Sequence, residues 1–378
     1  MRLAAMSGAE GEREGGVPPS RPWGPLCEVV GGARRLVVFL HDNPDPDAIA
    51  SGWILQRVAQ HLGVRSRVVY GGHLGRAENL AMVRLLRIPL TRLTKGTFQP
   101  RAGDRFALVD TQPGSANNSF PRKWRAHIVI DHHPRRRVSA ADFVDIRPGT
   151  GTCTTLLLDL ARTCGLPLDA RLATAAAYAI VSETQDLKRE SQREDRAALQ
   201  ELMPLVRLAT LGRIRHPPRP REYYLAVAQA MRNVQLGRNT CVCHVGPVPA
   251  PESVAELADF LAGMERVTWC LVTGLHAGTM VLSIRTTNAR GHAHRVMRRT
   301  VGSGGTGGGH RTMAGGQHPC ADETEYRRLC AAMTERFLAS VPHRAEVRLR
   351  PLVCEPAPPD GTKPALPPTA CPPAEDVP

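Results

Sequence analysis

The sequence predicts an α/β fold with a parallel β-sheet, joined to a smaller α+β domain. In the first half, short continuous apolar runs alternate with helical patterns, which is typical of a parallel sheet buried on both faces. Acids and histidines follow several of these runs directly. A break rich in Pro and Arg at 212–221 separates this half from a second half with a different pattern.

The strands and helices of the first half follow from its hydrophobic periodicity. Strands are predicted at 35–40, 67–70, 106–110, 127–131 and 143–147. Helices are predicted at 48–62, 80–86, 152–164 and 169–181, with a further helical stretch at 193–209. Because each strand precedes a helical pattern or another apolar run, βαβ connections are expected.

The second half predicts fewer strands and a glycine-rich loop. We expect a helix at 251–264, strands at 268–274 and 279–285, and a final helix at 322–339. A basic segment at 292–299 leads into the glycine-rich loop at 302–309. The expected organisation is a disordered leader (1–24), a first domain (25–210), a linker (211–222), a second domain (223–345) and a disordered Pro-rich tail (346–378).

Composition excludes several classes of protein. With 378 residues, 42% of them hydrophobic, the chain can bury a core in about two to three domains. Its apolar runs are too short to span a bilayer and its first residues lack a signal-like apolar stretch, so we expect a cytoplasmic protein without a membrane partner. The net charge of +14, carried mostly by Arg, fits a nucleic-acid partner but also fits biased codon usage.

The most informative residues are the acids and histidines after the predicted strands. His41, Asp45 and Asp47 follow the first strand, Asp110 ends another, and Asp131, His132 and His133 end a third; Glu183 and Asp186 follow the helix at 169–181. A single such acid is usually a turn or helix-capping residue. Because the carboxyl ends of parallel strands meet at one edge of the sheet, the set is expected to converge, and gathered carboxylates repel one another unless cations bind.

The predicted ligands are oxygen and imidazole without thiolate. This set suits Mn²⁺, with Mg²⁺, Fe²⁺ and Co²⁺ as alternatives. There are too many ligands for one ion, so we expect two ions about 3.5–4 Å apart that share a bridging carboxylate. Such a pair activates a water molecule and stabilises charge on a phosphoryl centre. The sequence therefore predicts metal-assisted phosphoester hydrolysis.

At these residues the chain resembles the DHH phosphoesterases, in the branch that carries a DHH-associated substrate domain. The segments that carry the resemblance are HDNPDPDAIAS, LVDTQ, VIDHHP, SETQDL and GTGGGHRTMAGG, and it covers roughly residues 35–340. It is strongest to the oligoribonucleases and the 3′-phosphoadenosine-5′-phosphate phosphatases, which are related to the RecJ exonucleases.

The resemblance implies a role for each residue of the set. One metal ion would be held by His41, Asp45 and Asp110; the second would be held by Asp47, Asp110 and His132 together with the acid of the fourth motif. Asp110 would bridge the two ions, His133 would face the scissile phosphate, and Asp131 would orient His132 or the loop.

The fourth motif departs from the family pattern. The family usually has Asp at this position, whereas this chain has Glu183. We expect Glu183 to be the ligand, with Asp186 as the alternative. If neither reached the metal, the second metal position would be weakened.

The second domain is expected to bind the substrate. The glycine-rich loop (Gly307, Gly308, Gly309) can direct backbone N–H groups at an anion, and His310 adds a donor. Arg285 is the first choice for a contact to phosphate or sugar; Arg298 is a weaker one, since it also fits an exposed basic helix face. The two domains are expected to close around the substrate.

The predicted activity is hydrolysis of short RNA or DNA oligonucleotides to nucleoside monophosphates, with two divalent ions, Mn²⁺ first, as cofactors. The same enzyme could remove the 3′-phosphate of phosphoadenosine phosphate. Two alternatives stay open: a phosphohydrolase for pyrophosphate or polyphosphate, and a nucleotide- or RNA-binding protein with a degraded metal site. A homodimer is also left open.

Overall fold

The computed structural model describes residues 23–94, 98–115, 117–135, 141–188, 191–309, 311–342 and 347–353. The chain separates into two compact units, Met1–Pro217 and Pro218–Pro378. Most of the predicted leader (1–24) and tail (346–378) lies outside the described residues. The prediction of disorder is wrong for two places in these segments. Trp23 is fully buried, and Arg350–Pro351 form an edge strand. The indole N–H of Trp23 donates a hydrogen bond to Asp159 (2.9 Å). This bond and the burial of the ring fix Trp23 in the fold although the residues before it are polar.

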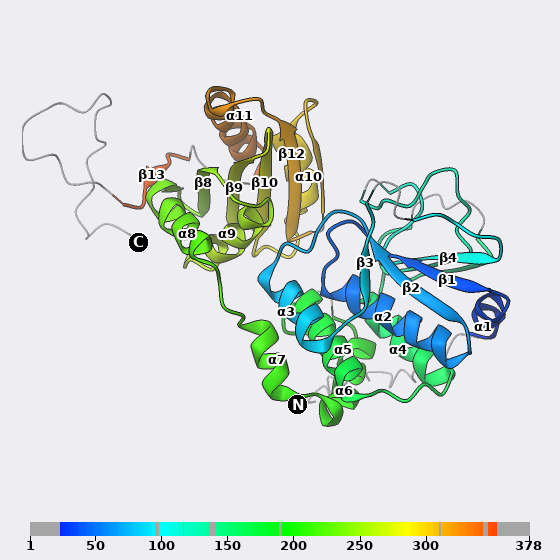
Figure 1. Ribbon diagram of the computed structural model, residues 1–378. Coiled ribbons are helices and arrows are strands. Elements are labelled where there is room, and N and C mark those ends of the chain that lie inside the picture. Colours follow the sequence, from blue (N-terminus) through cyan, green and yellow to red (C-terminus); the bar gives the residue numbers. More distant parts are fainter. Residues whose placement is uncertain are drawn as a thin grey trace, which may run out of the picture. The chain divides into compact units, whose positions relative to one another are not determined.

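The first unit is built on a six-stranded sheet in the order β3-β2-β1-β4-β5-β6 (Figure 1), and every neighbouring pair in it is parallel. The strands are β1 (Arg35–Phe39), β2 (Arg65–Tyr70), β3 (Leu90–Arg92), β4 (Asp104–Val109), β5 (Ile128–Asp131) and β6 (Phe143–Ile146). Chain order reverses between β1 and β4. The parallel α/β fold predicted from the apolar runs is confirmed, and β3 is an additional short edge strand.

Helices cover one face of this sheet. They are α1 (Gly24–Gly31), α2 (Pro46–His61), α3 (Ala77–Leu86), α4 (Cys153–Thr163), α5 (Ala170–Glu183), α6 (Arg193–Leu202) and α7 (Leu208–Arg215). Helix α2 begins where Asp45 accepts a hydrogen bond from the backbone N–H of Ala48 (3.0 Å), with Pro46 at its first position. It is buried along most of its length.

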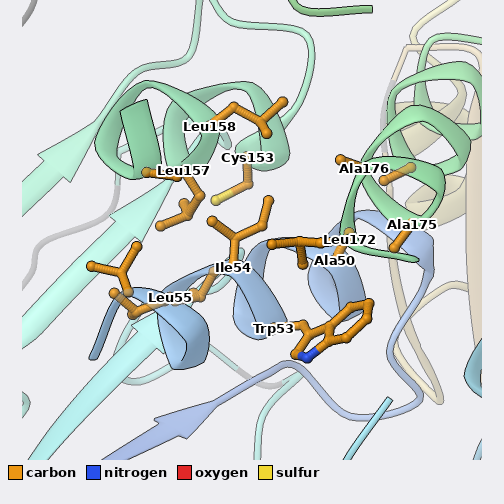
Figure 2. Packing of buried hydrophobic residues seen from close by; sticks show 14 of the residues in the cluster. Ala50, Trp53, Ile54, Leu55, Cys153, Leu157, Leu158, Leu172, Ala175 and Ala176 are labelled. Carbon is orange, nitrogen blue, oxygen red and sulfur yellow. The ribbon is translucent and has the colours of Figure 1, made fainter. Parts of the chain in front are cut away.

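The main core lies between α2, α4, α5 and the sheet. Figure 2 shows Ile54 of α2 facing Leu157 of α4, with Leu172 of α5 nearby. The other sheet face has a separate core, in which loop residues such as Phe120 and Trp124 pack on Phe39 and Phe106. Burial on both faces explains why the strands are continuously apolar instead of alternating.

The second unit has a seven-stranded mixed sheet in the order β11-β12-β10-β9-β8-β7-β13. Its strands are β7 (Val234–Leu236), β8 (Thr240–Pro247), β9 (Trp269–His276), β10 (Thr279–Thr286), β11 (Thr306–Gly309), β12 (Met313–Pro319) and β13 (Arg350–Pro351). Its helices are α8 (Arg221–Asn233), α9 (Glu252–Ala262), α10 (Ala293–Val301) and α11 (Glu323–Ser340). The predicted second α+β domain is confirmed.

Three details of the expected boundaries are corrected. The helical stretch at 193–209 is interrupted at Met203–Leu205, a 3₁₀ turn that contains Pro204. Residues Gly212–Arg215 continue helix α7, so the extended connection is shorter than the predicted linker. Arg is a good helix former, and only the prolines from Pro217 onward stop the helix. The glycine-rich segment is a strand at its end, Thr306–Gly309, which pairs antiparallel with β12.

Candidate metal centre

The predicted ligands converge where the strand order reverses. His41 follows β1, Asp110 follows β4 and Asp131 ends β5, on three adjacent strands of one parallel sheet. This is the position at which open α/β sheets bind ligands, because the loops diverge there and leave a crevice at the carboxyl edge. The convergence predicted from the strand-end acids is therefore present.

Asp110 lies between two groups of ligand atoms. Its Oδ2 lies 3.7 Å from Nε2 of His41, and its Oδ1 lies 3.3 Å from Nε2 of His132 and 3.5 Å from Nδ1 of His133. Asp45 completes the first group, with Oδ2 3.6 Å from Nε2 of His41. Among the described residues, two sets of three side chains have the spacing of a metal site, and Asp110 belongs to both: His41, Asp45 and Asp110, and Asp110, His132 and His133.

Asp110 has a buried side chain and an unusual backbone conformation. The residue is 1% exposed, and its Oδ1 has no hydrogen-bond donor within the described part of the chain. Its backbone φ is +60°, in the left-handed region that non-glycine residues seldom occupy. Its backbone N–H donates to the carbonyl of Ile130 (2.9 Å), which ties the turn after β4 to β5. A buried carboxylate oxygen without a donor is suited to a cation.

Two of the histidine rings are oriented by backbone carbonyls. Nδ1 of His41 lies 3.0 Å from the carbonyl oxygen of Asp42, and Nδ1 of His132 lies 3.2 Å from that of Thr150. Donation from Nδ1 leaves Nε2 of each ring facing the carboxylates, so Nε2 would be the nitrogen that binds an ion once the ion displaces its proton. This is how metal-binding histidines are fixed in the correct tautomer.

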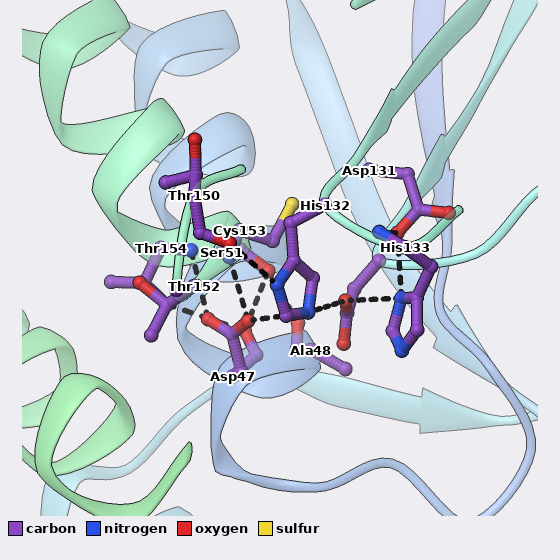
Figure 3. Close-up of polar contacts among 12 residues, drawn as sticks. Asp47, Ala48, Ser51, Asp131, His132, His133, Thr150, Thr152, Cys153 and Thr154 are labelled. Carbon is purple, nitrogen blue, oxygen red and sulfur yellow. Dashed lines mark hydrogen bonds and ion pairs between the residues drawn. The ribbon is translucent and has the colours of Figure 1, made fainter. Parts of the chain in front are cut away.

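Asp47 is held by the start of helix α4 (Figure 3). Its two carboxylate oxygens accept hydrogen bonds from the backbone N–H groups of Cys153 (2.7 Å) and Thr154 (2.8 Å), and its Oδ2 lies 3.7 Å from Nε2 of His132. The first N–H groups of a helix lack partners within the helix and carry its positive dipole end, so they stabilise a carboxylate. Asp47 is therefore fixed in place by the two backbone N–H groups.

Asp131 orients a different ring from the one that the family resemblance suggested first. Its Oδ1 accepts hydrogen bonds from the backbone N–H of His133 (3.1 Å) and pairs with Nδ1 of His133 (2.8 Å), while Gln112 donates to Oδ2 (2.6 Å). His132 is oriented instead by the carbonyl of Thr150. The side chain of Asp131 points back over its own turn, where the ring of His133 lies (Figure 3).

The charges of the site strongly perturb its pKa values. Burial and the neighbouring carboxylate of Asp110 raise the pKa of Asp47 well above its usual range. Burial lowers the pKa of His41, but the charges of Asp45 and Asp110 outweigh that effect and raise it to about 10. Burial likewise opposes the charge on His132, yet Asp110 raises its pKa well above the usual range. Without cations, protons balance these acids, and divalent ions would displace them.

The two candidates for the fourth-motif ligand lie in different surroundings. Glu183 is the last residue of α5, and its charge acts on both Asp47 and His132. Asp186 is exposed, and its Oδ1 accepts a hydrogen bond from Arg215 (3.0 Å) on helix α7. Glu183 is thus within electrostatic reach of the site, whereas Asp186 is engaged with Arg215.

These residues fit a pair of divalent ions. His41 and Asp45 with one oxygen of Asp110 would hold one ion, and His132 with the other oxygen of Asp110 would contribute to the second, beside Asp47. The donors are carboxylate oxygens and imidazole nitrogens, as Mn²⁺ and similar ions prefer. The buried Oδ1 of Asp110 supplies an acceptor that a second ion would satisfy.

Arg285, predicted to contact substrate, lies at the end of β10 with its guanidinium largely buried. Its Nε donates to Asp259 of helix α9, and its Nη1 donates to Ser283 (2.7 Å) and to the carbonyl of Ile284 (3.1 Å). Only 8% of the residue is exposed. The side chain is therefore rigidly held on the α9 side of the sheet.

The glycines of the predicted substrate loop have different surroundings. A Cβ at Gly307 would lie 2.8 Å from Met297 Cγ, and one at Gly316 of the paired strand would lie 2.6 Å from Met297 Sδ, so both permit α10 to pack closely. A Cβ at Gly308 would meet nothing, and Gly309 has a φ of +142°. His310 lies outside the described residues. Arg298 lies on the exposed face of α10.

Sequence reasoning missed the groups that hold the ligands in place. They are the carbonyl of Thr150, the side chain of Gln112 and the backbone N–H groups of Cys153 and Thr154. Backbone groups leave no residue signature. One sequence signal was available for the N–H groups of Cys153 and Thr154. It was the helix predicted to begin near residue 152, shortly after a strand.

Comparisons with known proteins show what the chain resembles. An uncharacterized protein of Methanocaldococcus jannaschii is 30% identical over 286 residues, which cover 75% of this chain and 58% of that protein. A probable manganese-dependent inorganic pyrophosphatase of Shouchella clausii is 29% identical over 174 residues, covering 46% of this chain and 55% of that protein. The chain thus spans less than two thirds of the length of these two relatives. No family model matches the chain.

A solved structure with the same fold is that of an exopolyphosphatase-related protein from Bacteroides fragilis. It has a TM-score of 0.65 and 14% identity, and it covers 82% of this chain and 94% of that chain. The chain therefore shares the fold of this exopolyphosphatase-related protein. Its strand-end acids and histidines are gathered at the carboxyl edge of its parallel sheet. No helix in the described part of the chain combines the length and apolar character needed to cross a membrane.

Proposed function

We propose that this protein is a two-metal phosphohydrolase. The observation that carries the proposal is the position of Asp110, whose two carboxylate oxygens face different histidine groups and whose Oδ1 is buried without a donor in the described chain. When bound, the ions would activate a water molecule and stabilise negative charge on a phosphoryl group. Asp110 would be shared between them.

The surrounding residues support this chemistry by fixing geometry in advance. Asp47 is held by the amino end of α4, and His41 and His132 are held by backbone carbonyls, so the ligands need little rearrangement to bind ions. His133, whose Nδ1 pairs with Asp131, would use its Nε2 on a phosphoryl oxygen of the substrate. Glu183 would complete the second ion's ligands, supported by its electrostatic effect on Asp47 and His132.

The proposed substrates are short RNA or DNA oligonucleotides, released as nucleoside monophosphates, and related small nucleotides such as 3′-phosphoadenosine-5′-phosphate. Support comes from the motif resemblance, the net charge of +14 and a second unit in which the backbone of Gly308 is open. In this proposal residues 25–210 perform the chemistry and 223–345 bind the substrate. Mn²⁺ is the proposed metal.

Inorganic pyrophosphate is the second candidate substrate. It is favoured by the relatives described as probable manganese-dependent inorganic pyrophosphatases, in Shouchella clausii and in Lactobacillus helveticus (25% identical over 246 residues, 60% of this chain and 75% of that protein). The strand-end acids of the first unit would serve hydrolysis of pyrophosphate as well as hydrolysis of oligonucleotides.

A substrate panel separates these proposals. The full chain would be incubated with Mn²⁺ and a dinucleotide of RNA, a dinucleotide of DNA, phosphoadenosine phosphate or pyrophosphate, and released monophosphate or phosphate would be measured. The matched control is Asp110→Asn, which keeps the side-chain shape and suits the left-handed backbone. Turnover of dinucleotides that Asp110→Asn abolishes supports the oligonucleotide proposal, whereas turnover of pyrophosphate alone supports the second candidate. If no substrate is turned over, the protein is a binding protein and the proposal is wrong.

A further inference from the structure

Asp195 is a buried acid that none of the predicted motifs contains. It lies in the first turn of α6 and is fully buried. Within the described part of the chain its partners are neutral N–H and O–H groups, and no basic side chain pairs with it. A carboxylate is costly to bury without an opposite charge, so the position of this acid calls for an explanation.

Helix capping explains only part of the contacts of Asp195. Its Oδ2 accepts a hydrogen bond from the backbone N–H of Gln192 (2.8 Å), the residue before the helix, as in a capping box. The same oxygen accepts a second bond from the backbone N–H of Gly151 (3.0 Å), and Oδ1 accepts one from the hydroxyl of Thr155 (2.6 Å). These two donors lie 44 and 40 residues away along the chain, around the start of α4. The side chain therefore holds a distant segment as well as its own helix.

The segment that Asp195 holds also holds two of the predicted metal ligands. The carbonyl oxygen of Thr150 lies 3.2 Å from Nδ1 of His132. The first backbone N–H groups of α4 donate to the carboxylate of Asp47 (2.7 and 2.8 Å). Figure 3 shows Thr150 beside the ring of His132, with the start of α4 around Asp47. Asp195 and the two ligands are thus bonded to the same short stretch of backbone.

A single peptide unit connects Asp195 to His132. The carbonyl of Thr150 and the N–H of Gly151 belong to the same peptide bond, which is planar and trans. In a trans peptide these two groups point in opposite directions, so the N–H reaches Oδ2 of Asp195 while the carbonyl reaches Nδ1 of His132. Because the unit is rigid, fixing the direction of its N–H also fixes the direction of its carbonyl. The orientation of the imidazole ring depends on that carbonyl.

The negative charge of Asp195 adds to this geometric effect. A hydrogen bond to a carboxylate polarises the peptide that donates it, so the carbonyl at the other end of that peptide becomes a better acceptor. A stronger bond from Nδ1 of His132 to this carbonyl makes Nε2 a better metal ligand. Carboxylates commonly act in this way by direct contact with a metal-binding histidine. Here a peptide lies between the carboxylate and the ring.

We propose that Asp195 is a positioning residue of the metal centre, which orients and polarises His132 through the peptide between Thr150 and Gly151. This inference rests on the proposed two-metal site. It gives a reason for burying a carboxylate at a place where helix capping alone needs only one of its hydrogen bonds.

The test is binding of Mn²⁺ to the full chain, measured by titration calorimetry after EDTA treatment and removal of the EDTA, so that no activity is needed. Asp195→Asn removes the charge and keeps the shape. Its carbonyl oxygen can still accept from Gly151, and its amide can donate to the hydroxyl of Thr155. The matched control is Asp104→Asn. Asp104 is also a buried acid, but it lies at the amino end of β4, away from the metal centre, where it accepts a hydrogen bond from Arg35 (3.0 Å).

We expect the unaltered chain to bind two ions and Asp195→Asn to bind one of them about tenfold more weakly, at the lower end of what groups that orient metal ligands contribute. Asp104→Asn should bind both ions as the unaltered chain does, although urea unfolding in EDTA should show that it is less stable. The proposal is overturned if Asp195→Asn binds Mn²⁺ unchanged or if Asp104→Asn loses as much affinity. Failure of Asp195→Asn to fold, seen by circular dichroism, would assign Asp195 to the fold alone and would also overturn it.

Asp110→Asn separates this inference from the proposed function. If Asp110→Asn abolishes Mn²⁺ binding while Asp195→Asn leaves it unchanged, the inference about Asp195 fails and the metal centre stands. If the unaltered chain binds no Mn²⁺, the metal centre itself is refuted, and the role of Asp195 is refuted with it.

Discussion

The carboxylate of Asp47 accepts a hydrogen bond from the backbone N–H of Cys153 (2.7 Å), although 106 residues separate them. With the second bond from Thr154, this contact joins the amino end of α2 to that of α4 and places Asp47 beside His132. One side chain therefore serves both the fold and the candidate metal centre. Asp110 differs, because its Oδ1 has no donor in the described chain.

These contacts predict that two similar substitutions disturb the site for different reasons. Asp47→Asn should abolish hydrolysis and also lower the free energy of unfolding of the metal-free protein by about 1–3 kcal/mol, because an amide NH₂ would face an N–H donor. Asp110→Asn should abolish hydrolysis and also lower that free energy, because it removes the carboxylate charge that His41 and His132 face. Activity assays and urea unfolding in EDTA check both. An unchanged free energy of unfolding in either variant would contradict the reason given for that variant.

The choice between two acids in the fourth motif gives a second prediction. Glu183→Gln should lower turnover with Mn²⁺ at least tenfold and raise the Mn²⁺ concentration needed for half-maximal activity, because it weakens the second ion's ligands. Asp186→Asn should leave both quantities within twofold, since that carboxylate is exposed and bonded to Arg215. The reverse ranking would make Asp186 the ligand.

The glycines around β11 allow packing and binding to be separated. Gly308→Ala places its methyl group in open space, so it should not change the melting temperature. If Gly308 approaches substrate, the same substitution should raise KM for a dinucleotide severalfold. Gly316→Ala should instead lower the free energy of unfolding by about 1–3 kcal/mol, because its methyl group meets Met297 and Val301. Thermal melts and steady-state kinetics of both variants provide the measurement.

The strand-end residues could be predicted from sequence because parallel strands force their carboxyl ends to one edge. A continuous apolar run such as 106–110 indicates a buried strand, and the acid that ends it must then lie at that edge. The backbone groups that orient the ligands, such as the carbonyl of Thr150, could not be predicted, because their positions depend on tertiary packing.

The prediction for the glycine-rich segment at 302–309 was partly wrong. Six glycines in eight residues predict a flexible loop, yet Thr306–Gly309 form an edge strand. Glycine disfavours strands on its own, but here it lets Met297 of α10 approach the sheet, and the packing gained outweighs the propensity.

His244 in the second unit predicts how stability depends on pH. Its Nδ1 lies 2.7 Å from the hydroxyl of Thr273 and its Nε2 lies 2.8 Å from that of Thr334, and burial lowers the pKa of His244 to about 4. In the unfolded chain the pKa is about 6.5, so between pH 6.5 and 4 the unfolded state binds a proton that the folded state does not. The free energy of unfolding should therefore fall as the pH is lowered through this window, by up to about 3 kcal/mol at its lower end. His244→Gln should flatten this dependence, whereas substitution of the exposed His216 should leave it unchanged. Urea unfolding of the three proteins at pH 7, 6, 5 and 4.5 measures it, and an equally steep loss in His244→Gln would show that other groups cause the acid sensitivity.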